Sequence, residues 1–433
     1  MVRKVSLKES QRSFEIAREV LPDGGSRSTI SLSPHSIYIK SASGKYLNDI
    51  DGNRYFDLNN NYTALIHGHA HPKITKAAVS QIKNGTGFSF GSEAEYSYAE
   101  MLCSRNQNFQ KIRFMNSGTE AVMNAIKAAR AYTGKSKIVK CENSYHGSYD
   151  YAEVSLGVDK TSPEDLKPTS MAYSSGTPQG VLDDVIVIPF NNTSTAKKII
   201  EESANELAAI LIDPFGQAYG RSIPSDGFLQ MLEDMCEKYH ILLIADEVIS
   251  FRAGYSGCQA ERKINPHLTV LGKIIGGGFP IGAVAGQNDV MDVFESHGKR
   301  AKLPHGGTFN ANPVSMAAGK KAMEMLTKDA FIELNKLGAL FRSGIQEVFE
   351  LSDVDGKVEG QFSIFGMTIN EALLSDFSER GKTYQSHGLH YYLLCKGYWL
   401  TPGLTGVCST VMDSSDVSAF CETLLEGIRA LRS

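Results

Sequence analysis

Two ionisable residues, Asp246 and Lys273, each follow a run of apolar residues, and they stand 27 positions apart. Asp246 comes after "ILLIA", whereas Lys273 comes after "TVLG" and precedes two isoleucines and three glycines. Such runs are typical of strands that are buried on both faces, and ligands in open α/β sheets bind beyond the carboxyl ends of the strands. The acid and the amine could therefore pair, or could bind opposite sides of one ligand to which the lysine forms an imine.

The stretch "FMNSGTEA" (114–121) has the form of a strand that leads directly into a helix. At the start of that helix, backbone N–H groups and the hydroxyls of Ser117 and Thr119 would surround a phosphate, and the helix dipole would favour the anion. Gly118 lies between these two residues. Because the same residues are also good helix caps, the motif alone does not identify a phosphate site. It does so only together with the other candidate groups.

Two further segments carry aromatic and hydroxyl groups. Tyr145 and His146 follow another apolar run and could stack on, or bond to, a flat ligand. Thr308 lies in "HGGTFNANP" (305–313), where glycines allow the backbone to approach an anion closely. A phosphate cradle, an aromatic face, an acid for a protonated ring nitrogen and an imine-forming lysine are together what pyridoxal 5′-phosphate (PLP) requires. We therefore predict PLP as the cofactor.

Other ligand motifs fail in their details. The "GKS" at 134–136 lacks the first glycine of a nucleotide phosphate loop and leaves a helix rather than a strand, and "GGGFPIG" (276–282) lacks the context of a dinucleotide fingerprint. His67, His69 and His71 lie close together in the sequence but have no acidic or cysteine partner nearby. We therefore predict no metal site.

Composition restricts the class of partner. The 433 residues are 42% hydrophobic. The 44 basic and 48 acidic residues give a net charge of −4, which does not indicate binding to nucleic acid. No run approaches the roughly 20 apolar residues of a membrane span, and the start lacks the apolar core of a signal peptide. Seven cysteines without a CxxC pair indicate neither a disulfide framework nor a zinc cluster. We expect a cytoplasmic protein that binds small molecules and neither nucleic acid nor membranes.

Strand, loop and helix patterns repeat from about residue 75 onward, which predicts an α/β fold with a mostly parallel central sheet and helices on both faces. The expected strands are 111–115, 137–142, 208–214 and 241–248, and the expected helices are 120–132 and 226–240. We divide the chain into an N-terminal segment that contributes to a small domain (1–70), a large PLP-binding domain (71–320) and a C-terminal α+β small domain (321–433).

The flanking segments give weaker patterns. Residues 6–21 predict a helix with Ser6 and Glu9 at the spacing of a capping box, and Asp51-Gly52 predicts a hairpin turn. Two more helices are expected, at 317–338 and at 415–431. The polar interval 156–180 has no apolar period, and loops of this length are either functional lids or plain surface loops.

Taken together, the motifs resemble the class III aminotransferases of PLP fold type I. The likeness runs in order from "GHAHPKI" (68–74) to "GGTFNANP" (306–313) and, more weakly, into both ends. The matching segments are 116–121, 145–147, 246–248, 271–278 and 307–309. Within the family, "YTGKSKIVKCENSYHGSYD" and "LTVLGKIIGGGFPIGAVAG" are most similar to the glutamate-1-semialdehyde aminomutase branch, which includes enzymes similar to the β-phenylalanine aminotransferases.

This resemblance implies a role for each residue that could surround the cofactor ring. Lys273 would form the Schiff base and then serve as the acid/base that moves the substrate proton. Asp246 would pair with the pyridinium nitrogen, Val248 would pack under the ring, and Tyr145 would stack over it. His146 is assigned to the same cofactor site.

The resemblance also implies how the phosphate is held. Gly118 and Thr119 would bind it, with Ser117 close by. The family forms homodimers with active sites shared at the subunit interface, and the threonine that matches Thr308 reaches the phosphate of the neighbouring subunit's cofactor.

Three departures concern the substrate rather than the cofactor. The family usually has Glu-Pro after the third strand, where this chain has Asp213-Pro214, and the tail segment that commonly reads His-Thr is "VMDSSDV" (411–417) here. Arg27 in "GGSRST" resembles the carboxylate-binding arginine of the β-phenylalanine-type enzymes, and a guanidinium suits a carboxylate. Arg27 and Asp213 are therefore the expected substrate-binding residues.

The predicted function is a PLP-dependent transfer of an amino group from an amino donor to a keto or aldehyde acceptor through an imine on Lys273. An intramolecular aminomutase stays open, because 156–180 lies where the aminomutase has its gating loop. A PLP-dependent racemase or elimination enzyme would use the same lysine. A catalytically silent PLP-fold binding protein is the non-enzyme alternative, and the presence of Lys273 and Asp246 speaks against it.

Overall fold

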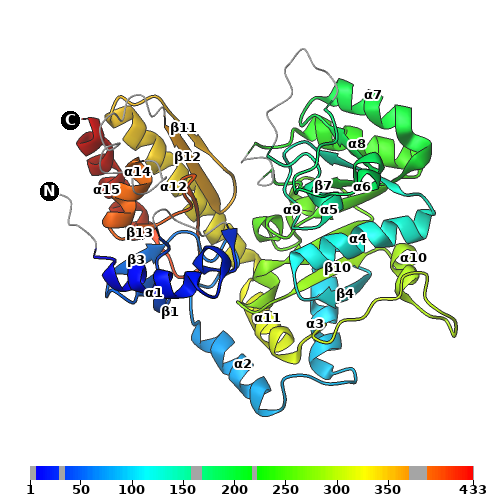
Figure 1. Cartoon of the computed structure of the whole chain (residues 1–433), viewed down its shortest axis with the longest axis horizontal. Coiled ribbons are helices and arrows are strands. Elements are labelled where there is room, and N and C mark those ends of the chain that lie inside the picture. The colour runs from blue at the N-terminus through cyan, green and yellow to red at the C-terminus, as the bar shows by residue number, and fades with distance from the viewer. Residues whose placement is uncertain (1–5, 29–34, 158–167, 217–221, 370–387, 433) are drawn as a thin grey trace. The chain divides into compact units, whose positions relative to one another are not determined.

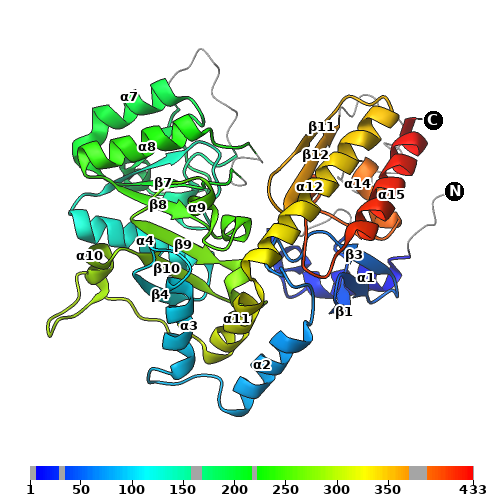
Figure 2. The ribbon, with the colours of Figure 1, turned by 180° about the vertical axis from the view of Figure 1, so that it is seen from behind.

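Two compact units make up the chain, and each is described by itself. The computed structural model describes residues 6–28, 35–157, 168–216, 222–369 and 388–432. The central unit comprises Lys73–Phe331, and the terminal unit comprises Met1–Pro72 together with Ile332–Ser433. Two opposite views show the elements of each unit (Figure 1, Figure 2). Within the described ranges, no helix has the length and apolar character needed to cross a membrane.

A seven-stranded sheet with the order β4-β10-β9-β8-β7-β5-β6 forms the middle of the central unit. Its strands are β4 (Lys111–Met115), β5 (Lys137–Cys141), β6 (Val185–Ile188), β7 (Leu207–Ile212), β8 (Leu242–Asp246), β9 (Leu268–Gly272) and β10 (Gly282–Gly286). All neighbours from β9 to β6 are parallel, whereas β10 runs antiparallel to β4 and β9. The predicted α/β fold with a mostly parallel sheet is confirmed, and each predicted strand overlaps an observed one.

Helices cover both faces of this sheet (Figure 1). One apolar core lies between the sheet and α4, and the other lies between the sheet and α7 and α8. Neighbouring residues of β5 alternate between the cores, with Ile138 in the first and Val139 in the second. The helices are α2 (Pro72–Lys83), α3 (Glu93–Cys103), α4 (Gly118–Thr133), α5 (Asp150–Glu153), α6 (Gln179–Asp184), α7 (Thr193–Ser203), α8 (Asp226–Tyr239), α9 (Cys258–Glu261), α10 (Asn288–Met291) and α11 (Pro313–Met325).

The ends of α4 have causes that can be read in the sequence. The Ser117 hydroxyl accepts a hydrogen bond from the Glu120 N–H at 3.1 Å, which caps the first turn. Gly134 ends the helix in the left-handed conformation with a φ of 72°. The helix predicted at 120–132 is therefore α4, and the helix predicted at 226–240 is α8.

The terminal unit contains two small sheets, with the orders β1-β2-β3-β13 and β11-β12-β14. Its strands are β1 (Ile39–Ser43), β2 (Tyr46–Asp49), β3 (Arg54–Asp57), β11 (Gly356–Glu359), β12 (Ile364–Ile369), β13 (Tyr398–Trp399) and β14 (Thr405–Val407). Its helices are α1 (Lys8–Arg18), α12 (Lys328–Leu351), α14 (Gly388–Cys395) and α15 (Ser414–Arg432). The hairpin turn predicted at Asp51-Gly52 joins β2 to β3, and Gly52 has a φ of 86°.

The capping box predicted for the first helix is wrong. Helix α1 begins after Leu7, which has no side-chain cap, and the acceptor comes from the β2–β3 turn instead. Asp51 accepts hydrogen bonds from the N–H groups of Glu9 at 2.7 Å and Ser10 at 3.0 Å. The acceptor lies more than forty residues away in the chain, so local spacing could not reveal it.

The single helix predicted at 317–338 is also wrong, because the structure divides it into α11 and α12. The chain leaves helical geometry at Leu326, and the Thr327 hydroxyl accepts the Ala330 N–H at 3.2 Å to start the next helix. Arg105 donates to the carbonyls of Met323 and Leu326 at the end of α11. A buried guanidinium thus satisfies the last carbonyls of the first helix. The final predicted helix corresponds to α15.

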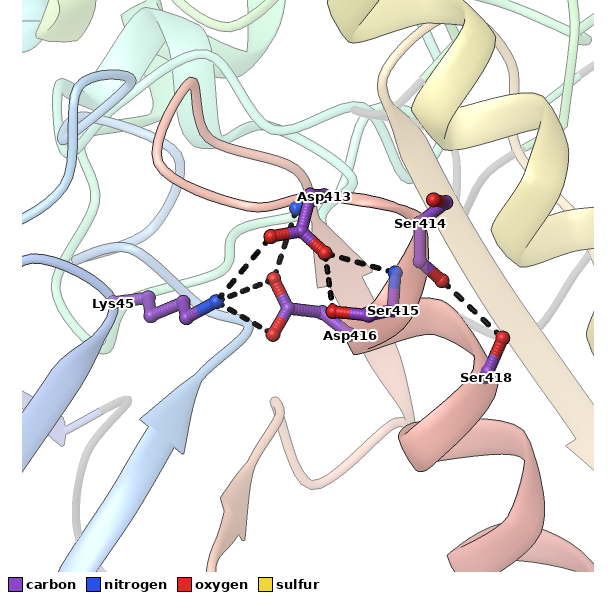
Figure 3. A network of polar contacts seen from close by, with 6 residues as sticks. All are labelled: Lys45, Asp413, Ser414, Ser415, Asp416 and Ser418. Carbon is purple, nitrogen blue, oxygen red and sulfur yellow. Dashed lines mark hydrogen bonds and ion pairs between the residues drawn. The ribbon is translucent and has the colours of Figure 1, made fainter.

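Acidic residues of the segment 411–417 start helix α15 (Figure 3). Asp413 accepts the Ser415 N–H at 2.8 Å, and Asp416 accepts the Asp413 N–H at 2.9 Å, which together form a reciprocal cap. Lys45 Nζ lies 2.6 Å from Asp416 Oδ1 and 4.0 Å from Asp413 Oδ2. The departure from the family's usual His-Thr therefore places a helix cap and an ion pair at this point.

The described part of the polar interval 156–180 is tied to Ser155. Residues 158–167 lie outside the described residues. After them, the Ser155 N–H donates to the carbonyl of Met171 and the Ser155 hydroxyl donates to the carbonyl of Thr169, each at 2.8 Å. The chain then enters α6 at Gln179.

Replacing Asp51 by alanine removes the acceptor for both N–H groups of α1. We expect the free energy of unfolding of Asp51→Ala to fall by about 1 kcal/mol, as for other lost helix caps, in urea denaturation followed by circular dichroism. Asp51→Asn keeps an oxygen acceptor and is the matched control, for which a smaller loss is expected. An Asp51→Ala protein as stable as the wild type would show that the turn does not cap the helix.

Candidate active site

The carboxyl ends of β8 and β9 bring Asp246 and Lys273 to one edge of the central sheet. These strands are parallel neighbours, and Asp246, the last residue of β8, lies opposite Val270 of β9. Lys273 follows the last residue of β9 directly. The same edge receives the segments that follow β4, β5 and β7, because these strands run in the same direction as β8. The parallel topology therefore collects most of the predicted site residues.

Lys273 carries a buried amine without a polar partner. Among the described residues, its Nζ makes no hydrogen bond or ion pair, although part of the side chain is exposed. Burial lowers the pKa of the amine to about 8, against the opposing effect of the Asp246 carboxylate. The backbone has a φ of 50°, a conformation that costs a non-glycine residue roughly 1–3 kcal/mol and is concentrated at functional sites.

Two donors hold the Asp246 carboxylate, and Lys273 is not one of them. His146 Nδ1 lies 2.8 Å from Asp246 Oδ2, and the Val248 N–H donates to Asp246 Oδ1 at 3.0 Å. Burial lowers the pKa of His146, while the Asp246 carboxylate acts to raise it. With its proton on Nδ1, the neutral imidazole donates to the carboxylate, and its Nε2 then has no partner.

The start of α4 has the properties of an anion site. Within the part of the chain that the structure describes, the backbone N–H groups of Gly118 and Thr119 have no acceptor. The Thr119 hydroxyl accepts the Ser148 N–H at 3.2 Å. This bond links the phosphate cradle, which is Ser117, Gly118 and Thr119 at the start of α4, to the segment after β5. Since α4 has 16 residues, its dipole adds to these free N–H groups.

Val248 and two glycines bring the cradle close to the lysine. A Cβ placed on Gly118 would lie 2.9 Å from Val248 Cγ1, and one on Gly272 would lie 3.3 Å from it. A third glycine, Gly282 of β10, pairs with the ends of both β4 and β9, and a Cβ there would lie 1.9 Å from the Ser117 carbonyl oxygen. Sequence analysis missed Gly282, because only the approach of two distant segments excludes a side chain there.

Tyr145 and Thr308 are exposed in a single chain. The Tyr145 side chain is 52% exposed and is free to face a ligand. Thr308 has no polar partner among the described residues, but Asn310 accepts a hydrogen bond from Asn116, next to Ser117, at 3.0 Å. The loop of Thr308 is therefore attached to the start of α4, while Thr308 itself is exposed.

Arg27 belongs to the terminal unit, where it meets a strained turn. Its Nη1 donates to Asn61 Oδ1 at 3.0 Å. The residues 60–63 all have positive φ values between 50° and 75°, although none is glycine. Asp57 Oδ1 accepts the N–H groups of Asn59 and Asn60, both at 2.9 Å, and so offsets part of the strain.

Asp213 and Glu247 are buried acids behind the same edge. Asp213 accepts the Phe215 N–H at 2.9 Å, and its charge acts on both Glu247 and Lys273. Glu247 accepts from the N–H groups of Cys258 at 2.6 Å and Gln259 at 2.9 Å, and from the Gln259 side-chain amide at 2.7 Å. Burial nevertheless raises the pKa of Glu247 to about 7. Glu247 therefore anchors the segment after β8 rather than facing a ligand.

Lys140 is a second buried lysine that the sequence analysis did not identify. It lies on β5 with no exposed surface, and its Nζ donates to the Val154 carbonyl at 2.6 Å. Burial lowers the pKa of this amine to about 8 as well. The signal in the sequence was a lysine inside the apolar strand "KIVKC".

The histidines of "IHGHAH" are engaged inside the terminal unit. His67 Nδ1 lies 2.8 Å from Thr410 Oγ1, and His69 Nε2 lies 2.7 Å from Asp57 Oδ2. Within the described ranges, one group of three possible metal ligands comes together elsewhere, at Asp292, Glu295 and His297, and all three are exposed. The sequence analysis found no acidic partner near the histidines of "IHGHAH", whereas the structure brings Asp57 to His69.

Known proteins resemble this chain in sequence and in structure. A model of the class-III aminotransferase family matches residues 30–394. The glutamate-1-semialdehyde 2,1-aminomutase of Methanothermobacter thermautotrophicus is 34% identical over 430 residues, which cover 98% of this chain and 100% of that protein. A solved omega-transaminase from Sphaerobacter thermophilus is 43% identical with a TM-score of 0.92 and covers 98% of both chains. A β-phenylalanine aminotransferase from Variovorax paradoxus is 29% identical with a TM-score of 0.85, covering 98% of this chain and 94% of that one.

The lowered pKa of Lys273 predicts unusual nucleophilicity in the protein without cofactor. Above pH 8 most of this amine is neutral, so competitive acetylation followed by mass spectrometry should give a labelling rate that rises through about pH 8. Lys140 is the matched control: its pKa is also about 8, but it is fully buried and should resist the reagent. A Lys273 rate that begins to rise only near the pKa of about 10.4 of a free lysine would contradict the role of burial.

Proposed function

The chain belongs to the class-III aminotransferases, and we propose that it moves an amino group from an amino acid to a separate keto or aldehyde acceptor at the edge formed by β8 and β9. It is a PLP-dependent enzyme, as the family is. The observation that carries the proposal is the buried, unpartnered amine of Lys273 beside the strand that ends in Asp246.

The residues at this edge fit PLP. Free N–H groups at the start of α4 suit its phosphate, and the buried carboxylate of Asp246 suits its ring nitrogen. Lys273 would hold the cofactor covalently, Val248 and Tyr145 would contact its ring, and Ser117, Gly118 and Thr119 would bind its phosphate. When bound, PLP supplies an aldehyde that captures amines and a ring that takes up electrons.

Lys273 would also move the proton. Its Nζ accepts a proton only in the neutral form, and a pKa of about 8 leaves a fraction of the amine neutral near pH 7. Because no ion pair from the described residues holds the ammonium form, the amine can take a proton from the α-carbon of the substrate and return it elsewhere. A salt-bridged lysine would have a higher pKa and would stay protonated near pH 7, so it could not accept the proton.

Asp246 would present a fixed carboxylate to the ring nitrogen. Two N–H donors, from His146 and Val248, stabilise the carboxylate and fix its orientation. A fixed carboxylate favours a protonated ring nitrogen and so favours electron uptake by the ring. His146 acts through Asp246 and is a positioning residue.

The substrate side of the proposal rests on Arg27 and Asp213. The Arg27 guanidinium suits a substrate carboxylate, and the strained turn at 60–63 holds it through Asn61. Asp213 is buried behind the sheet edge and acts on Lys273 by its charge. We propose an amino acid as donor, and the distance between its amino and carboxylate groups is the property that a substrate survey should vary.

An intramolecular aminomutase is the second candidate, and the similarity to the archaeal aminomutase along almost the whole chain favours it. Both reactions need the same lysine and acid. They differ in whether the amino group leaves with a separate acceptor or returns to the same carbon skeleton.

A panel of α-, β- and ω-amino donors separates these functions. The purified protein with PLP is mixed with each donor alone, and conversion of PLP to pyridoxamine phosphate is followed by its absorption. We expect conversion with at least one simple donor, and loss of conversion by at least a factor of 1000, or about 4 kcal/mol, in Lys273→Ala because the base is missing.

The matched control for that panel is Lys263→Ala, which removes a lysine outside the sheet edge. Borohydride reduction of the wild type, followed by peptide mass spectrometry, should place the cofactor on Lys273. Conversion of glutamate-1-semialdehyde alone, with no response to any simple donor, would favour the aminomutase. Attachment to a lysine other than Lys273 would contradict the proposed site.

We propose further that the enzyme is a homodimer with shared active sites. Phe88, Phe90 and Phe309 are 49%, 88% and 64% exposed, and the hydrogen bond from Asn312 to the Thr86 carbonyl brings their segments together. Exposed apolar groups of this size are typical of protein interfaces. Thr308 lies beside Phe309 and would reach the phosphate bound by the second chain.

Light scattering after size exclusion tests this arrangement. We expect a dimer for the wild type, and monomers for the double variant Phe90→Asp, Phe309→Asp, because two charges would be buried in the interface. Leu351→Asp is the control, since Leu351 is 61% exposed on a different element. A double variant that stays dimeric and keeps its PLP affinity would exclude this surface as the interface.

A further inference from the structure

The turn that begins with Lys273 needs support from outside. It is a short 3₁₀ helix, η6 (Lys273–Gly276), which follows β9 directly. Lys273 has a φ of 50°, and such a strained backbone persists only where the surrounding structure holds it. A single 3₁₀ turn has poor hydrogen-bond geometry and little stability of its own. The position of the lysine therefore depends on what packs against η6.

Tyr98 of α3 supplies a hydrogen bond to this turn. Its hydroxyl donates to the carbonyl of Ile275, and among the described residues no other donor reaches that carbonyl. Tyr98 and Ile275 are both fully buried. Burial raises the pKa of the Tyr98 hydroxyl far above its usual range, so the hydroxyl keeps its proton and stays a donor. Without this hydroxyl the Ile275 carbonyl would be a buried acceptor with no partner, which is costly.

The same side chain also contacts the strand that leads to the phosphate cradle. The Tyr98 ring stacks on the Phe114 ring, with the centroids 5.7 Å apart and the planes at 11°. Phe114 lies in β4, which ends just before the cradle at the start of α4. One buried side chain thus joins the two segments that would hold PLP, the cradle at its phosphate and η6 at its covalent bond.

Helix α11 confines the same carbonyl. A Cβ placed on Gly319 of α11 would lie 2.1 Å from the Ile275 carbonyl oxygen and 3.1 Å from the Tyr98 hydroxyl oxygen. In the first turn of α11, the Ser315 hydroxyl donates to the Pro280 carbonyl at 2.8 Å, which holds the chain beyond the three glycines. A side chain at position 319 would therefore displace the Ile275 carbonyl.

We propose that Tyr98 is a positioning residue, which holds the Ile275 carbonyl and so fixes the turn of Lys273 relative to the phosphate cradle. The inference rests on the proposed function, in which Lys273 bonds the cofactor and moves the proton. Tyr98 acts through the backbone of η6, since its hydroxyl is bonded to Ile275 and not to the amine. Misplacing a reacting group by about 1 Å can cost a factor of about 100 in rate.

Hydrogen exchange in the protein without cofactor tests the contact. Tyr98→Phe removes the hydroxyl but keeps the ring that stacks on Phe114, and Tyr96→Phe on the same helix is the matched control, because Tyr96 is 64% exposed. Exchange is followed by mass spectrometry on a peptide that covers η6. We expect it to be faster by a factor of about 10 in Tyr98→Phe, or about 1.4 kcal/mol, and unchanged in Tyr96→Phe.

Peptides from α7 and α8 are the internal reference and should keep their wild-type exchange rates in Tyr98→Phe. An unchanged rate at η6 would overturn the proposal. A uniform increase over the whole central unit would also overturn it, because the hydroxyl would then stabilise the fold in general. If Tyr98→Phe does not fold, Gly319→Ala takes its place, since its Cβ would displace the same carbonyl and should also accelerate exchange at η6.

A second measurement separates this proposal from the proposed function. In the holoenzyme, conversion of PLP to pyridoxamine phosphate is measured in a single turnover, per bound PLP, over a range of donor concentrations. In Tyr98→Phe we expect the rate at saturating donor to fall by a factor of about 10 to 100, and the half-saturating concentration to stay within about twofold. A general loss of stability would lower the amount of bound PLP and leave this rate unchanged.

The outcomes of the two measurements are distinct. If the wild type converts no donor, the proposed function fails, while hydrogen exchange still decides whether Tyr98 holds the turn. If the wild type converts a donor and Tyr98→Phe does so at the same rate, the positioning role of Tyr98 is overturned and the proposed function stands.

Discussion

The constraint on which the central unit depends is a buried amine, that of Lys273, to which no described residue forms a hydrogen bond. Within the described residues Lys273 forms no ion pair with Asp246, and each oxygen of Asp246 is occupied by another donor, His146 Nδ1 or the Val248 N–H. An ion pair between Lys273 and Asp246 would raise the pKa of the amine and remove its nucleophilicity. The fold therefore has to place an acid near a lysine without letting the two form an ion pair. The ends of two neighbouring strands achieve this.

Rigid polar support behind the sheet edge makes this separation possible. Glu247, next to Asp246 in the chain, accepts three hydrogen bonds from Cys258 and Gln259, and the Gln259 amide also donates to Thr269 at 3.1 Å. Buried polar groups stabilise a unique arrangement only when they are fully paired, as these are. Glycines complete the support from the other side, since Gly282 lets the carbonyl of Ser117 approach β10. The cradle and the lysine are thus held by backbone geometry rather than by flexible side chains.

The two units differ in what they contribute to the chemistry. The proposed cofactor site consists of residues of the central unit, and these are also the residues whose motifs resemble the family. The terminal unit holds Arg27 and the turn 60–63, whose strain is offset by Asp57. Backbone strain is concentrated at functional sites, and Arg27, the proposed substrate residue, contacts this turn.

The sequence by itself determined the class of fold and the cofactor, and it predicted the edge of the sheet where we propose the chemistry takes place. Apolar runs, the Ser117-Gly118-Thr119 junction and the places of Asp246 and Lys273 at strand ends are local properties, and parallel strands bring their ends to one edge in whatever order they pair. Only the tertiary structure decided the partners. Asp246 pairs with His146, which is 100 residues away, Asp51 rather than Ser6 caps α1, and the buried Lys140 donates to the carbonyl of Val154. Hydrogen bonds and burial depend on strand order and on the approach of distant segments, and spacing along the chain does not encode either.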